Sequence, residues 1–245
     1  IHHQVANASH FLHQYIDSRE SSLRYSTDVI IQDFGFRQTI ASNDLPTIKS
    51  MLTNHAERVQ ADLMLLVSNQ GELIASNELD VPPNELADIN WLAFHEASEQ
   101  GQFVEINKHL YRLFSLPVKA PHQVAIAIIA FEINVPLLEE LKLKTGLDII
   151  FQSSQSDLFL TTYPIDKKQF EKILENDGSP TLWWQRSQYL LEKVPLSSPM
   201  EQQIQLFLLA DLSVFYRVFD QLNYSLLALT LFIVLLAVIL STLLA

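Results

Sequence analysis

The sequence lacks residues that several classes of protein depend on. It contains no cysteine, which excludes a disulfide framework, catalysis by a thiol and zinc sites built on cysteine. Its five glycines stand apart from one another, so no glycine-rich loop of the kind that binds phosphates is present. The sequence therefore excludes nucleotide-binding proteins of the Walker and dinucleotide types.

Basic residues are also few. The chain has 16 lysines and arginines against 28 aspartates and glutamates, which gives a formal net charge of -12. A protein that binds nucleic acid needs a stripe of basic side chains to meet the phosphates, and no such stripe is visible. We therefore expect no nucleic acid as a partner, and we expect anionic lipid head groups to repel the acidic part of the chain.

Catalytic motifs are missing as well. The sequence contains no HExxH, GxSxG or EF-hand motif, and its serines, histidines and aspartates are scattered. His10, His13 and Asp17 fall within two turns of one helical face, but three such residues without a fourth are typical of a solvated polar face. We expect this segment to have no enzymatic activity, no metal site and no cofactor.

The longest apolar run closes the chain. From Ser225 to Ala245 it holds no charged residue, no proline and no glycine. At about 1.5 Å per residue, some 20 helical residues span the hydrocarbon core of a bilayer, which is about 30 Å thick. A buried core helix is the alternative. We predict that a helix starts at Ser213 and that its Ser225 to Ala245 part crosses a lipid bilayer.

The chain opens with a second long helical pattern. Apolar residues recur every three or four positions from Val5 to about Phe36, which predicts an amphipathic helix. Ile16, Leu23 and Ile30 are spaced as in a heptad repeat. One stripe of this helix can then pack on its own domain while another meets a partner helix. We expect the helix to mediate a homodimer.

Between these two helices, the apolar period predicts a series of shorter elements that repeats its order once. The first series comprises a helix at 45–59, strands at 63–67 and 73–75, a helix at 85–100, and strands at 103–106, 110–118 and 124–133. The second comprises a helix at 135–145, strands at 147–152 and 158–162, a helix at 166–175, and strands at 183–184, 189–194 and 204–210. This order is typical of an α+β fold with two PAS-like antiparallel-sheet modules, each covered by helices on one face.

The predicted organisation follows from these elements. Residues 1–43 form a long N-terminal dimerisation helix, 44–145 a membrane-distal module, 146–212 a membrane-proximal module, and 213–245 a signalling and transmembrane helix.

A ligand pocket in a PAS-like module would lie between the sheet and its covering helix. Trp91 and His95 are one helical turn apart, and alternation sends Tyr111 and Arg112 to opposite faces of their strand. Arg112 is the best candidate for holding an anionic group, and two alanines on the next strand leave room for a ligand. Each of these residues also has an alternative interpretation without a ligand. Trp91 would be a core aromatic residue, His95 a surface residue, and Arg112 part of an ion pair at the sheet edge. The candidate ligand-binding residues are Trp91, His95, Tyr111, Arg112, Ala125 and Ala127.

Several blocks of the sequence resemble the double Cache ectodomain of bacterial membrane receptors, in the variety found on proteins with cytoplasmic GGDEF and EAL domains. They read DFGFRQTIASND at 33–44, NHAERVQADL at 54–63, NQGELIAS at 69–76, LPVKAP at 116–121 and LKTGLD at 143–148. The likeness extends over nearly the whole chain and is strongest between Asp33 and Ser76.

The resemblance implies a periplasmic sensor held in the bacterial inner membrane between two membrane helices, the first of them upstream of Ile1. It implies a small-molecule ligand and an output beyond Ala245, namely a diguanylate cyclase or phosphodiesterase that controls cyclic-di-GMP. The alternative is a membrane-anchored periplasmic binding or scaffold module without signalling output.

Overall fold

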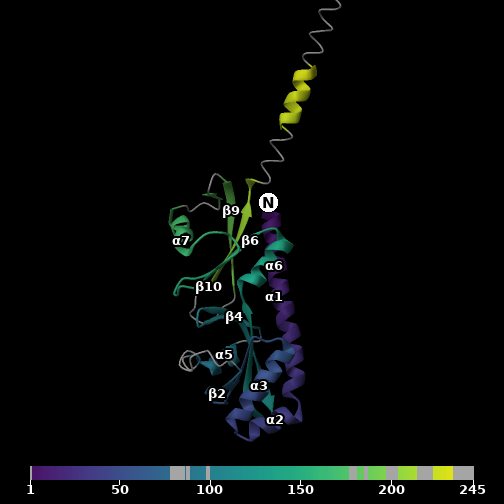
Figure 1. The fold of residues 1–245 in the computed structure, drawn as a ribbon, viewed down its shortest axis with the longest axis vertical. Coiled ribbons are helices and arrows are strands. Elements are labelled where there is room, and N and C mark those ends of the chain that lie inside the picture. The colour runs from purple at the N-terminus through teal and green to yellow at the C-terminus, as the bar shows by residue number, and fades with distance from the viewer. Residues whose placement is uncertain are drawn as a thin grey trace, which may run out of the picture.

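A computed structural model describes residues 2–77, 86, 89–97, 100–176, 181–184, 187–196, 204–213 and 223–233. Helix α1 (His2–Ile31) runs along one side of two antiparallel sheets that follow one another along its length (Figure 1). The fold is therefore α+β, with an N-terminal helix and two sheets, as the sequence predicts.

The long N-terminal helix is shorter than predicted, because α1 ends at Ile31 instead of continuing to about Phe36. Asp33 begins a new helix, α2 (Phe34–Ala41), by accepting hydrogen bonds from the backbone N–H groups of Gly35 and Phe36. An aspartate that caps a helix in this way breaks the preceding one, since its backbone is extended. Helix α3 (Leu45–Val59) then begins at the predicted place, with a proline in its first turn.

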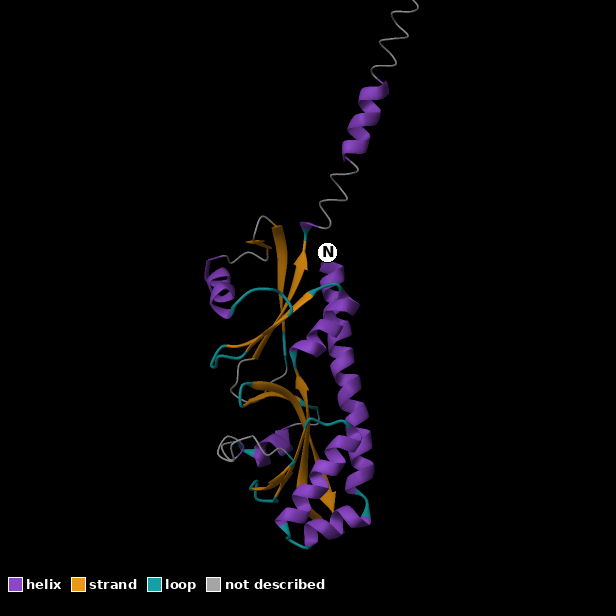
Figure 2. Cartoon of the chain, viewed as in Figure 1, coloured by secondary structure: helices purple, strands orange, loops and turns teal. Residues whose placement is uncertain are grey.

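The first sheet has the strand order β2-β1-β5-β4-β3, with every neighbouring pair antiparallel. Helices cover both of its faces: α1, α2 and α3 lie on one, and α5 (Trp91–Ala97) on the other (Figure 2). The prediction of a cover on one face is wrong for this sheet, because its central strands are apolar on both sides. The strands are β1 (Leu63–Val67), β2 (Leu73–Ser76), β3 (Gln102–Ile106), β4 (His109–Lys119) and β5 (Gln123–Ile133).

The second sheet repeats the first. Its strand order is β7-β6-β10-β9-β8, so each strand has the place of its counterpart in the first sheet. Helix α6 (Val135–Thr145) connects the sheets, and α7 (Lys167–Asn176) packs on the second one. The predicted repeat of element order is thereby confirmed. The strands are β6 (Asp148–Ser153), β7 (Phe159–Thr161), β8 (Thr181–Trp184), β9 (Ser187–Val194) and β10 (Ile204–Asp211).

One apolar core joins α1 to both modules. It includes Val5 and Leu12 at the start of α1, Phe114 and Phe131 of the first sheet, and Leu206 of β10. The modules also touch directly, through the rings of Phe103 and Phe151, whose centroids are 5.8 Å apart. The hydroxyl of Ser156 adds a hydrogen bond to the carboxylate of Glu105. Helix α1 and these contacts hold the two modules together.

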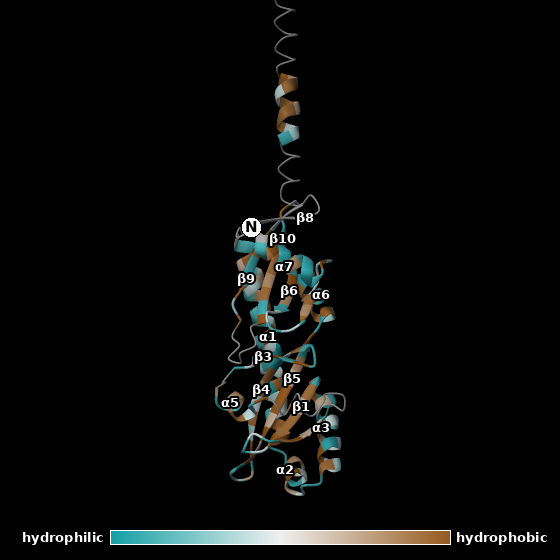
Figure 3. Cartoon of the chain, turned by 90° about the vertical axis from the view of Figure 1, so that its left-hand side faces the viewer, coloured by the Kyte–Doolittle hydropathy of each residue, from teal (hydrophilic) through white to brown (hydrophobic). Residues whose placement is uncertain are grey.

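At the other end of the chain, residues 223–233 form a helix with exposed apolar side chains, coloured brown in Figure 3. The predicted transmembrane helix from Ser213 to Ala245 lies otherwise outside the described residues, at 214–222 and 234–245. Within the part of the chain that is described, no helix combines the length and the apolar character needed to span a membrane.

Candidate ligand-binding site

The six candidate residues fall on opposite faces of the first sheet. On β4, Arg112 points toward α1 and Tyr111 toward α5, so the predicted alternation is confirmed. Ala125 and Ala127 are fully buried on the α1 face, where helices cover them. The structure thus brings Trp91, His95 and Tyr111 to one face and places the other three candidates behind the sheet. As ligand-binding residues, all six stay predictions.

Trp91 anchors α5 on the sheet. It is 1% exposed, and its indole N–H donates a hydrogen bond of 2.8 Å to the carbonyl of Leu86. Its ring meets that of Phe94 edge to face, with centroids 6.0 Å apart at 81°. Because its one polar atom is already bonded, Trp91 contributes only apolar surface to this face.

His95 supplies polar atoms on the same face. Its Nδ1 lies 2.8 Å from the hydroxyl oxygen of Ser115, which is on the same side of β4 as Tyr111 and faces α5. Burial lowers the pKa of His95, and the nearby carboxylate of Glu96 only partly opposes that shift. The imidazole is therefore neutral at neutral pH, with one nitrogen able to donate and the other to accept.

Gln102 is the polar residue on this face that the sequence analysis missed. It is 2% exposed and pairs in register with Leu113 of β4, and neither atom of its carboxamide has a hydrogen-bond partner among the described residues. A buried polar group left unpaired costs about 1–3 kcal/mol. The sequence could have indicated this placement, because alternation along a strand puts Gln102 on the same face as the apolar residues Val104 and Ile106.

Arg112 lies behind the sheet in a buried ion pair. Its Nε donates a hydrogen bond of 3.0 Å to Glu20 of α1, and the carboxylate of Asp17 lies 3.5 Å from its terminal nitrogen. Its guanidinium stacks over the ring of Phe103, with 4.8 Å to the centroid. The charge of Arg112 is therefore balanced within the protein, and the arginine holds α1 on the sheet.

Glu20 is the centre of this cluster and receives hydrogen bonds from three groups. They are the backbone N–H of Gly101 at 2.8 Å, Arg112 at 3.0 Å and Arg24 at 3.0 Å. Arg24 also donates to the carbonyl oxygen of Ser115 at 3.3 Å. Ser115 thus contacts His95 with its hydroxyl and α1 with its carbonyl, so it links the two faces of the sheet.

Gly101 completes the link, because it precedes Gln102 and bonds to Glu20. A Cβ atom at this glycine would lie 2.8 Å from the carboxylate carbon of Glu20 and 2.8 Å from the carbonyl oxygen of Leu113. Only glycine therefore lets α1 approach the sheet so closely here.

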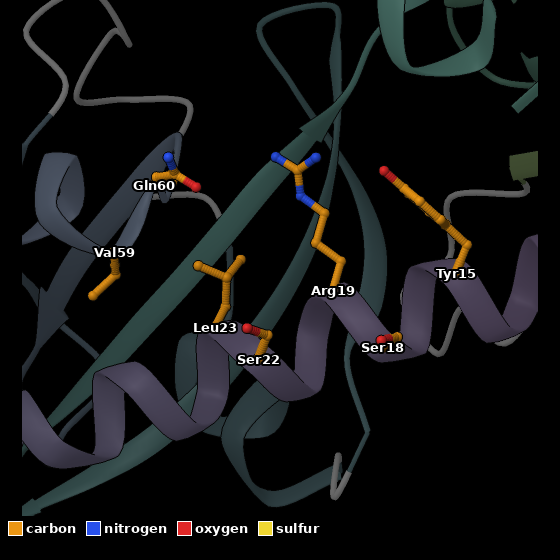
Figure 4. Close-up of a pocket in the computed structure, with 7 residues that line it drawn as sticks. All are labelled: Tyr15, Ser18, Arg19, Ser22, Leu23, Val59 and Gln60. Carbon is orange, nitrogen blue, oxygen red and sulfur yellow. The ribbon is translucent and has the colours of Figure 1, made fainter. Parts of the chain in front are cut away.

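A separate pocket of about 360 Å³ opens on the α1 face, between α1 and the end of α3 (Figure 4). None of the six candidate residues lines it. Its lining residues are Tyr15, Ser18, Arg19, Ser22, Leu23, Val59 and Gln60.

Comparison of the sequence with models of known protein families identifies the family of the chain. Residues 1–211 match the family described as "Double sensory domain of two-component sensor kinase", a double Cache family. No curated protein matches the sequence.

Among solved structures, the periplasmic domain of Vibrio cholerae LuxQ is similar, with a TM-score of 0.61 and 11% identity over 84% of this chain and 99% of that chain. The ligand-binding domain of the Campylobacter jejuni chemoreceptor Tlp3, solved with 4-methylisoleucine, aligns with a TM-score of 0.52 and 11% identity, covering 86% of this chain and 89% of that chain. At these identities the likeness is one of fold.

Proposed function

Because the chain belongs to the double Cache family of sensory domains, we propose that it is the extracytoplasmic ligand-sensing part of a membrane-bound signal-transduction receptor. The family match over residues 1–211 is the observation that carries this proposal. A sensory family agrees with the expectation that this segment is not an enzyme. The complex of the similar Tlp3 domain with 4-methylisoleucine supports a small molecule as the class of ligand.

The proposed ligand site lies between the first sheet and α5. The buried carboxamide of Gln102 is the main support, since it needs both an acceptor and a donor and has neither among the described residues. His95 and Ser115 add a second polar pair, and Trp91 and Phe94 form the apolar wall. This arrangement suits a small molecule with an apolar body and a group, such as an amide, that both donates and accepts hydrogen bonds.

The proposed route from this site runs through α1. Ser115 and Gly101 each border the ligand face and each bond to α1, through Arg24 and Glu20. A ligand that repositions these residues changes how α1 sits on the sheet, provided it binds one arrangement more tightly than the other. The second module rests on the same helix, so it receives the change.

A thermal-shift screen of the full chain in lipid nanodiscs against metabolites tests the site. A ligand present at 100 times its Kd stabilises the protein by about 2.7 kcal/mol. The change Gln102→Leu should abolish the shift produced by a hit. The matched control is Gln152→Leu, since Gln152 is a buried glutamine of the second module whose amide oxygen has no partner among the described residues. Loss of the shift in the control alone would place the ligand in the second module and reject the site.

We also propose that the receptor is a homodimer joined through α1. Tyr25 and Val29 stand one turn apart near the end of α1 and form an apolar stripe of the kind that packs on a partner helix. Tyr25 is 76% and Val29 60% exposed, so this stripe is open to a partner helix. The sequence has no cysteine, so Tyr25→Cys can form a disulfide only between chains. Asp28→Cys, on another face of α1, is the matched control, and equal cross-linking of both variants would argue against the stripe.

Finally, we propose that Ser225 to Ala245 anchors the protein in the inner membrane and passes the signal to enzymes of cyclic-di-GMP metabolism. The apolar run and the sequence resemblance support this output. The change Phe219→Pro should abolish the response of cellular cyclic-di-GMP to ligand while leaving binding intact. The alternative, a membrane-anchored binding or scaffold module, is favoured if ligand binds and no change in cyclic-di-GMP follows in the unmodified protein.

A further inference from the structure

The pocket between α1 and α3 lies on the opposite face of the sheet from the proposed sensory site. We propose that it is a second binding site, which takes a small organic monocarboxylate with its carboxylate on Arg19 and its apolar part against Leu23 and Val59. This inference goes beyond the proposed function, because it adds a site that the route from Gln102 to α1 does not use.

Arg19 is the cation of this pocket. Its guanidinium lies over the ring of Phe131 of β5, with 4.9 Å to the centroid, and it has neither an ion pair nor a hydrogen bond within the described residues. A contact of this kind with a ring face uses the charge of a guanidinium and provides no hydrogen-bond acceptor, so its N–H groups still need one. Two parallel N–H groups match the two oxygens of a carboxylate. Arg19 is therefore held in place with its donors unused.

The rest of the lining suits an anion with a small apolar body. Ser18 and Ser22 present hydroxyls from α1, and Gln60 presents an amide from the end of α3 (Figure 4). Tyr15 adds its ring, since its hydroxyl is hydrogen-bonded to Glu140 of α6. None of the seven lining residues is acidic. Leu23 and Val59 supply apolar surface, and about 360 Å³ is enough for a molecule of a few carbon atoms.

The charges around the pocket favour a single negative charge over two. Lys144 of α6 lies over the ring of Tyr15 at 5.1 Å, but it is paired with Glu140 at 2.6 Å. Glu140 interacts mainly with Lys144, which lowers the pKa of this carboxylate most, and more weakly with the charge of Arg19, so Arg19 is compensated only in part. A carboxylate matches that one charge, whereas a phosphate dianion would keep a negative charge near Glu140 and within a protein of net charge -12.

The pocket lies where a bound molecule can affect the contact between α1 and α6. Tyr15 joins the pocket to α6, the helix that connects the two modules, through its contact with Lys144. A carboxylate on Arg19 therefore acts where α1 meets the connection between the modules.

Binding of sodium butyrate to the full chain in nanodiscs, measured by isothermal titration calorimetry, tests the proposal. We expect saturable binding that Arg19→Met weakens at least tenfold, since methionine keeps a long unbranched side chain and removes the donors. Ser22→Phe, which fills the pocket and leaves Arg19 in place, should weaken binding to a similar degree. Arg58→Met is the matched control, because Arg58 is exposed near the end of α3 and does not line the pocket.

The outcomes separate the possibilities. Loss of binding in Arg19→Met and Ser22→Phe, with Arg58→Met unchanged, supports the site. No saturable binding, or binding that both pocket variants retain, overturns it. Binding that is lost in Gln102→Leu and retained in Arg19→Met also overturns it, because the probe then occupies the face of α5. Inorganic phosphate binding as tightly as butyrate would overturn the assignment to a monocarboxylate.

Discussion

The two modules share one strand order but hold α1 by different means. In the first module, Glu20 of α1 joins Arg112, Arg24 and Gly101 in a buried cluster of directional hydrogen bonds. In the second, α1 contacts β10 through the apolar core, and within the described residues no ion pair connects α1 to the second sheet. Charged hydrogen bonds fix position and angle, whereas apolar contacts depend mainly on buried area. The first module therefore fixes the position and angle of α1, and the second module packs on the helix in that position.

The largest effect should come from breaking the buried pair. Arg112→Met leaves Glu20 buried without its main partner and should lower the free energy of unfolding by about 3–5 kcal/mol. Lys142→Met, which breaks the more exposed pair between Lys142 of the connecting helix α6 and Asp148 of the second module, should cost about 1 kcal/mol or less. Denaturant unfolding of the full chain measures both. Adding Glu20→Gln to Arg112→Met should recover part of the loss, and equal losses in the two modules would contradict the comparison.

A smaller effect should come from the glycines. Gly101→Ala should cost about 2 kcal/mol, because the added Cβ meets Glu20 and the carbonyl of Leu113 and forces α1 outward. Gly146→Ala, where the second module begins, meets open space and should cost about 1 kcal/mol for its φ of +72° alone. The same unfolding measurement ranks the two variants. A reversed ranking would show that α1 does not need its close approach at Gly101.

Removing one hydroxyl should have a smaller effect still. Ser115→Ala removes the bond to His95 and keeps the carbonyl that accepts from Arg24, so it should cost about 1 kcal/mol. If Ser115 links the two faces of the sheet, hydrogen exchange should show faster opening of α5, with the middle of α1 unchanged. Faster exchange in α1 to the same extent would mean that the hydroxyl also holds α1.

The smallest effect should be on the pH dependence of stability. Burial lowers the pKa of His55 and of His95 below 6.5, and both lie in the first module, while residues 146–212 contain no histidine. Below pH 6.5 these histidines bind protons more readily in the unfolded chain than in the folded one. The free energy of unfolding is therefore highest above pH 6.5 and decreases as the pH falls. Hydrogen exchange at pH 7.5 and 5.5 should show the first module opening more readily in acid. His95→Asn should reduce this difference, and an unchanged difference would exclude a role for His95.

The pattern of the sequence was sufficient to predict the order of the elements, since each helix or strand reflects a local period of apolar residues. It failed where a local cap competed with that period, at Asp33, which breaks the long helix. It also missed Gln102 as a site residue, because one glutamine in an apolar strand is informative only once its burial is known.

By itself, the sequence determined that two similar modules follow a long helix and that Tyr111 and Arg112 point to opposite sides of their strand. Alternation and helical period are properties of a few neighbouring residues, so they can be read locally. Only the tertiary structure decided which side α1 covers and that Arg112 meets Glu20, which is 92 residues away in the chain. Such a meeting depends on how whole elements pack, and a buried charge finds its partner only after the sheet and the helix have come together.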